Sequence, residues 1–191
     1  MNYRSISSND DLFEYIFNEY SDDIYRLIFT YVKKKEIAED LVQDVFIKCY
    51  KNIDNFKGNS SVKTWIISIA INQCKDYLKS AYSRYVYLSD KISSLAKGNT
   101  KTPEDLVLED YGKDRLTNEI LNLPLKYREV IYLYYFQELK IKEIAVVLGV
   151  NENTMKSRLS RAKELIKKNL QEGSTKDGEK YQTTSQGISF E

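Results

Sequence analysis

The chain has 191 residues, 42% of them hydrophobic, and its formal net charge is +1 at pH 7. This length and apolar content suffice for one ordinary domain or two small ones, and they exclude an intrinsically disordered protein. Histidine is absent, which excludes His-based catalysis, and with only two cysteines the composition argues against a zinc site.

The cysteines and the apolar stretches indicate a compartment. Cys49 and Cys74 both lie in apolar periodic segments, so we predict buried, inert thiols in a reducing environment. No stretch is apolar enough to span a bilayer, and the N-terminus lacks the apolar core of a signal peptide. We therefore expect a cytoplasmic protein without membrane insertion.

Apolar periodicity predicts an all-α fold. Glycine and proline are scarce, with seven and two residues, and apolar side chains recur at helical spacing. The first helix is expected over 11–34 after a Ser8-Asn9-Asp10 cap, and the second over 36–53. The third, over 62–80, carries two apolar stripes, which predicts the central helix of a compact bundle.

The pattern then divides the chain into two small helical domains. Residues 1–80 form the first domain and 116–171 the second. Between them the polar segment 81–115 is predicted to be a flexible linker, with a short helix starting at Pro103. The polar residues 172–191 are predicted to be a disordered tail.

The second domain ends in a predicted helix-turn-helix. A short apolar-striped helix over 141–148 is followed by a turn around Gly149 and then by a longer helix, with Asn151 as its cap. Projection of this second helix places Met155, Leu159, Ala162, Ile166 and Leu170 inward. It places Asn153, Ser157, Ser160, Arg161 and Glu164 outward, with Lys156 and Arg158 on the flanks.

The charge of this last helix indicates an anionic partner. Residues 153–170 carry six bases against one acid, whereas residues 1–25 carry six acids against one base. Short polar side chains bordered by cations suit the major groove of DNA, where Arg161 could bind a guanine edge. A basic outer face is also typical of a merely solvated helix, and the preceding helix and turn favour DNA binding.

Two extended segments carry a resemblance to a known family. AEDLVQDVFIKCYKNIDNFKGNSSVKTWIISIAINQCKDYL is similar to region two, and LPLKYREVIYLYYFQELKIKEIAVVLGVNENTMKSRLSRAKELI to region four, of bacterial RNA polymerase sigma factors of the extracytoplasmic-function (ECF) group. The resemblance implies a subunit that binds core RNA polymerase and directs it to promoter DNA. The implied contacts to the minus-thirty-five element are Asn153, Lys156, Ser157, Arg158, Ser160 and Arg161.

Region two implies two further sites. The family motif Asp-Leu-x-Gln-Glu-x-Phe appears with Asp in place of Glu, and its polymerase-binding residues are Asp40, Gln43, Asp44 and Phe46. A loop and the helix after it supply polar and aromatic groups suited to holding an unstacked base of the minus-ten strand. These residues are Phe56, Ser60, Ser61, Lys63, Thr64, Asn72 and Asp76.

Several alternatives remain open on the residues alone. Trp65 belongs to the inward stripe, Phe56 could either pack or contact a base, and Asn72 is either a buried amide or a base contact. No nucleophile–base pair, phosphate loop or metal cluster is visible, so we expect neither an enzyme nor a cofactor. An anti-sigma protein is a further partner implied by the resemblance. Rival hypotheses are a stand-alone helix-turn-helix regulator and a sigma-like adaptor that does not recognise promoters.

Overall fold

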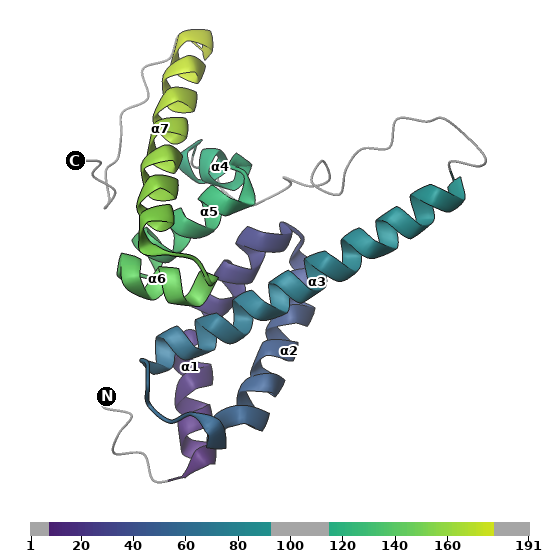
Figure 1. Cartoon of the computed structure of the whole chain (residues 1–191), viewed down its shortest axis with the longest axis vertical. Helices are drawn as coiled ribbons and strands as arrows, with labels where there is room; N and C mark the ends of the chain where they lie inside the picture. The colour runs from purple at the N-terminus through teal and green to yellow at the C-terminus, as the bar shows by residue number, and fades with distance from the viewer. Residues whose placement is uncertain (1–7, 93–114, 178–191) are drawn as a thin grey trace. The chain divides into compact units, whose positions relative to one another are not determined.

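The computed structural model describes residues 8–92 and 115–177, which form two compact units built from helices (Figure 1). This confirms the predicted all-α fold of two small helical domains. The first unit contains α1 (Asn9–Val32), α2 (Lys35–Asn52), the 3₁₀ turn η2 (Ile53–Asn55) and α3 (Val62–Ile92). The second contains α4 (Arg115–Asn122), α5 (Leu125–Ile131), the π-helix η4 (Tyr132–Phe136), α6 (Ile141–Leu148) and α7 (Glu152–Asp177).

In the first unit, α3 packs against both α1 and α2. Ile66 and Ala70 from one of its stripes and Ile67 and Ile71 from the other are all buried. Each buried isoleucine contributes about 1.5–3 kcal/mol relative to an exposed one. The prediction of a central helix covered on two sides is therefore confirmed.

The ends of α1 follow local chemistry. The Ser8 hydroxyl oxygen accepts a hydrogen bond from the Asp11 N–H (3.1 Å), which satisfies one of the unpaired donors of the first turn. At the other end Lys33 adopts a left-handed conformation (φ 54°) and its N–H donates to the Phe29 carbonyl. This cap turns the chain so that α2 begins directly afterwards.

Helix α3 is longer than predicted. It was expected to end at Ser80, but it continues to Ile92, beyond the ends of α1 and α2 (Figure 1). Between Val62 and Ile92 the sequence contains neither glycine nor proline. Loss of apolar periodicity removes packing partners but not helix propensity, so nothing in this segment breaks the helix.

The core of the second unit lies between α4, α5 and α7. Its central side chains are Ile120, Leu123, Ile131, Ala162 and Ile166. Arg128 is buried on α5, and its Nη1 donates to the carbonyls of Leu121 (2.6 Å) and Leu123 (3.1 Å). These bonds satisfy backbone acceptors at the end of α4 and so fix α4 to α5.

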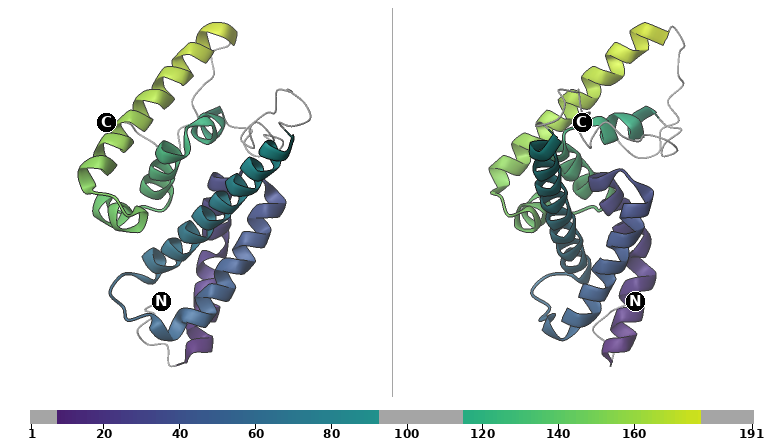
Figure 2. Two further views of the ribbon diagram at one scale, coloured as in Figure 1. Left: turned by 45° about the vertical axis from the view of Figure 1, so that its right-hand side comes forward. Right: turned by 90° about the vertical axis from the view of Figure 1, so that its right-hand side faces the viewer.

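Helix α7 extends past the other helices of its unit (Figures 1 and 2) and ends at Asp177. The predicted tail was expected to start at residue 172, so its first residues are helical instead. The segments around Pro124, Gln137–Lys140 and Gly149–Asn151 all separate elements. The predicted short helix at Pro103 lies outside the described residues.

Candidate nucleic-acid interface

The turn of the helix-turn-helix is built as its sequence predicts. Gly149 caps α6 with φ 72°, a conformation that side chains with a Cβ disfavour, although a Cβ there would meet no neighbour within 4 Å. The Asn151 side-chain oxygen accepts from the Thr154 N–H at 2.7 Å. The predicted cap is confirmed, and it fixes where α7 begins.

Helix α7 divides into a buried and an exposed face. Met155, Ala162 and Ile166 are fully buried. The exposed residues of its first turns include five of the six predicted minus-thirty-five contacts, namely Asn153, Lys156, Ser157, Ser160 and Arg161. The predicted face is therefore available to a ligand.

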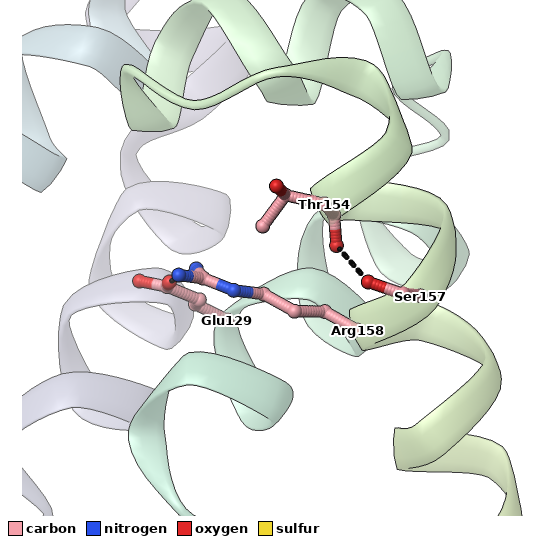
Figure 3. Close-up of polar contacts among 4 residues, drawn as sticks. All are labelled: Glu129, Thr154, Ser157 and Arg158. Carbon is pink, nitrogen blue, oxygen red and sulfur yellow. Dashed lines mark hydrogen bonds and ion pairs between the residues drawn. The ribbon is translucent and has the colours of Figure 1, made fainter.

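Within this face the polar groups differ in how firmly they are held. The Ser157 hydroxyl donates to the Thr154 carbonyl at 3.0 Å (Figure 3). Arg161 Nη1 lies 2.8 Å from a Glu164 carboxylate oxygen, and both side chains are 59% exposed. Such a surface pair contributes only about 0–1 kcal/mol, so the guanidinium can exchange Glu164 for another acceptor at little cost.

Arg158 is the exception among the six. Its side chain is 25% exposed and points toward Glu129 of α5, with Nη1 3.3 Å from Oε1 (Figure 3). In this structure the guanidinium faces a neighbouring helix, and the role of Arg158 as a DNA contact stays a prediction.

The loop before α3 is partly structural. The Ser61 hydroxyl oxygen accepts from the Thr64 N–H at 3.0 Å and lies 2.8 Å from the Thr64 hydroxyl. Thr64 is only 6% exposed, so it is not available to a base, contrary to the prediction. Ser60 is exposed, and its hydroxyl donates only weakly, to the Ser61 carbonyl at 3.3 Å.

Of the remaining minus-ten candidates, some share one face of α3 and others do not. Phe56 packs on Trp65 with ring centroids 5.0 Å apart, and both are partly buried. Asn72 and Asp76 follow Trp65 at helical spacing and are exposed, which rules out the buried amide. Lys63 lies about 160° around the helix from Trp65, so the structure does not bring it to the same face.

Helix α2 presents the polar part of the predicted polymerase motif. Asp40, Gln43 and Asp44 are exposed. Asp44 accepts a hydrogen bond from Gln73 Nε2 of α3 at 2.9 Å, and the Gln73 oxygen accepts from Lys48. Asp44 is thereby held in place by a neighbouring helix.

Phe46 also differs from its predicted role. It is only 4% exposed, and its ring lies 4.9 Å from that of Phe17 and 6.3 Å from that of Phe13, so it belongs to the core. Three apolar side chains that were not predicted as part of the site are exposed beside it. Phe17, Ile47 and Tyr50 are 46%, 52% and 51% exposed. Their positions in the sequence lie off the inward apolar stripes of their helices, and this could have predicted their exposure.

The two cysteines are buried thiols of low reactivity. Both are buried and unbridged, and burial raises the pKa of Cys49 and of Cys74 to about 12. This confirms the prediction of buried thiols. Among the residues that the structure describes, no three Cys, Asp or Glu side chains are grouped so that they could hold a metal ion.

Comparison with known proteins decides the family. Residues 16–84 match the Sigma-70 region 2 model, and residues 113–166 match the Sigma-70 region 4 model. The ECF RNA polymerase sigma factor SigM of Bacillus subtilis is 34% identical over 80% of this chain and 91% of its own length. For SigW of the same organism the identity is 33%, over 86% and 91%. The chain belongs to the ECF sigma factors.

Two solved sigma-factor structures support the fold. The sigma factor RpoE of Bartonella quintana, solved in complex with the anti-sigma factor NepR, is 22% identical with a TM-score of 0.61, covering 83% of this chain and 96% of its own. CnrH, solved with the cytosolic domain of CnrY, is 16% identical with a TM-score of 0.59, covering 89% and 92%. Sigma factors are transcription initiation factors rather than catalysts. Within the described parts of this sigma factor, none of the helices combines the length and apolar content of a transmembrane span.

Proposed function

We propose that this sigma factor recognises the minus-thirty-five element with the outer face of α7. The observation that carries the proposal is the exposed set of short polar and cationic side chains on a helix whose start is fixed by Asn151. Ser157 and Ser160 are short enough for α7 to approach the floor of the major groove. Arg161 supplies a planar donor and Lys156 a phosphate contact. This function is assigned to residues 116–171.

The first unit is proposed to hold the minus-ten strand, and we assign this function to residues 1–80 within it. The Phe56–Trp65 pair offers an aromatic surface for a base face, and Asn72 and Asp76 offer polar groups for a base edge. Ser60 and Lys63 are proposed to contact the strand as it passes the loop. Ser61 supports this site by capping α3, and the Thr64 hydroxyl lies against that of Ser61.

The contact with core RNA polymerase is proposed to lie on α2. Asp40, Gln43 and Asp44 supply exposed polar groups there. The neighbouring exposed side chains of Phe17, Ile47 and Tyr50 extend the surface with apolar area. An apolar patch beside polar groups is typical of a protein–protein interface.

An anti-sigma protein is proposed as a regulatory partner. Both solved relatives described above were captured with a second protein, named in one case as an anti-sigma factor. A near-neutral sigma factor does not bind DNA strongly by charge alone, so its activity depends on which protein it meets. We place the protein in the cytoplasm, together with polymerase and DNA.

Run-off transcription with core polymerase tests the proposal. We expect transcripts from a cognate promoter only when the sigma factor is added. Arg161→Ala is expected to lower the output about tenfold, because a specific base contact is worth about 1–3 kcal/mol. Lys156→Ala, which removes a proposed phosphate contact, is expected to lower the output as well. Lys126→Ala is the matched control, since this exposed lysine of α5 lies over the Tyr127 ring and outside the proposed surface.

The same experiment separates the rival functions. A stand-alone regulator would bind a palindromic operator tightly without core polymerase in a gel shift. An adaptor would bind polymerase, but its output would not change with Arg161→Ala or with the promoter sequence. Either result would contradict the proposed function.

A further inference from the structure

Arg158 and Arg161 lie one turn apart on α7 but occupy different environments. Arg161 is 59% exposed and pairs with an equally exposed Glu164. Arg158 is 25% exposed and pairs with Glu129, whose side chain is 9% exposed (Figure 3). The two arginines therefore differ in their surroundings, although both belong to the same basic helix.

Burial makes the Glu129–Arg158 pair hard to exchange. A buried carboxylate loses its hydration and needs charged or hydrogen-bonding partners inside the protein. If Arg158 turned outward to a DNA phosphate, the carboxylate of Glu129 would lose the cation that lies 3.3 Å away. The same movement costs Arg161 little, because its partner is solvated.

The pair joins two rigid parts of the unit. Glu129 lies on α5, which Arg128 fixes to the end of α4 through the Leu121 and Leu123 carbonyls. Arg158 lies next to Ser157 in the part of α7 that presents the proposed DNA contacts. The chain of polar contacts therefore runs from α4 through α5 to the DNA-facing part of α7.

Such a directional contact sets the rotation of α7 about its axis. The close-packed apolar side chains beneath α7 seat the helix, and the ion pair adds a contact that requires defined atom positions. With side chains reaching about 5–6 Å from the axis, a rotation of about 10° moves the tip of Ser157 or Arg161 by about 1 Å. A displacement of this size is enough to degrade a hydrogen-bonded contact to a base edge.

We infer that Arg158 is a positioning residue, which acts through Glu129 to orient α7 and does not contact DNA. The inference rests on the proposed function, because it assumes that α7 binds the minus-thirty-five element. It revises the role implied for Arg158 by its place in the basic helix. It also assigns a role to Glu129, which lies outside the helix-turn-helix.

The test measures the affinity of polymerase holoenzyme for a promoter duplex as a function of salt. We expect Arg158→Gln and Glu129→Gln each to weaken binding to the minus-thirty-five sequence about tenfold, and the double variant no further, because both remove the same pair. Neither should change the slope of log affinity against log salt. Lys156→Gln, which removes a proposed phosphate contact, should lower that slope by about one.

The Glu129→Gln variant separates a positioning role of Arg158 from a direct phosphate contact most sharply. If Arg158 bound a phosphate, releasing it from Glu129 would strengthen binding or leave it unchanged, and Arg158→Gln would reduce the salt slope. Either observation would overturn the inference. If neither Lys156→Gln nor Arg161→Gln affected binding, the proposed function itself would fail.

The selectivity for the minus-thirty-five sequence distinguishes a misoriented α7 from a second unit that is merely less stable. Loss of folded protein lowers affinity for the promoter and for a scrambled minus-thirty-five sequence by the same factor. A misoriented α7 instead lowers the ratio of the two affinities, since base contacts alone carry the sequence preference. We expect this ratio to fall for Arg158→Gln, measured at a temperature where circular dichroism shows the variant to be folded. An unchanged ratio would contradict a positioning role.

Discussion

Removing the Ser61 hydroxyl should destabilise the first unit. This hydroxyl caps α3 by accepting from the Thr64 N–H at 3.0 Å, and the Ser61 carbonyl accepts from the Trp65 N–H at 3.0 Å. Loss of a serine cap costs about 0.5–2 kcal/mol. The Ser61 oxygen also lies 2.8 Å from the buried Thr64 hydroxyl, which places the expected loss in the upper half, at about 1–2 kcal/mol. For a unit of this size, that lowers the melting temperature by about 4–15 °C.

Tryptophan fluorescence provides the assay. Trp65 is the sole tryptophan of the sequence and packs on Phe56 beside the cap, so its emission reports unfolding of the first unit. Ser60→Ala is the matched control, because Ser60 is exposed and its hydroxyl forms only the 3.3 Å contact. Ser61→Asp keeps an acceptor at the cap and should retain stability. Equal shifts for Ser60→Ala and Ser61→Ala would refute the assignment of Ser61 as the cap.

Three further predictions concern a backbone conformation, the thiols and the minus-ten site. Glu138 is exposed with φ 54°, so Glu138→Gly should be about 0.5–1 kcal/mol more stable than Glu138→Ala in thermal unfolding followed by circular dichroism, and the reverse order would contradict this. Because the folded state raises the pKa of both thiols from 9.0 to about 12, stability should fall as pH rises from about 9 toward 12. The urea concentration at the midpoint of unfolding should be lower at pH 10 than at pH 8. A Cys74→Ala variant should lose less stability between these two pH values than the unaltered protein. Asn72→Ala should weaken holoenzyme binding to a single-stranded minus-ten oligonucleotide without lowering the melting temperature. Asn122→Ala, at an exposed position of the second unit, is the control. A lower melting temperature with unchanged binding would make Asn72 a structural residue.

Periodicity predicted the elements where the apolar pattern and the breaking residues agree. The helix-turn-helix followed from the stripe of 141–148, the left-handed Gly149 and the Asn151 cap, which are all local features. The end of α3 could not be placed this way, because no breaker occurs before Ile92. The π-helix at Tyr132–Phe136 was not predicted either, since its apolar residues fit an ordinary helix equally well.

Three predicted site residues are less exposed than a direct contact would favour. Phe46 and Thr64 were placed in sites by resemblance and by residue type, yet both are buried: Phe46 packs against Phe13 and Phe17 of α1, and the Thr64 hydroxyl lies against that of Ser61. Arg158 sits on a flank of the helical projection, from which a long side chain can reach either solvent or a neighbouring helix. Its partner Glu129 lies 29 residues away, so its orientation depends on tertiary structure.

Site-specific photocrosslinking in the holoenzyme tests the central claim most directly. A photoreactive side chain in place of Ser160 should crosslink to promoter DNA at the minus-thirty-five element, and one in place of Asn72 to the non-template strand at the minus-ten element. Crosslinks from Ser160 to polymerase alone, or from Asn72 to neither DNA strand, would contradict the account.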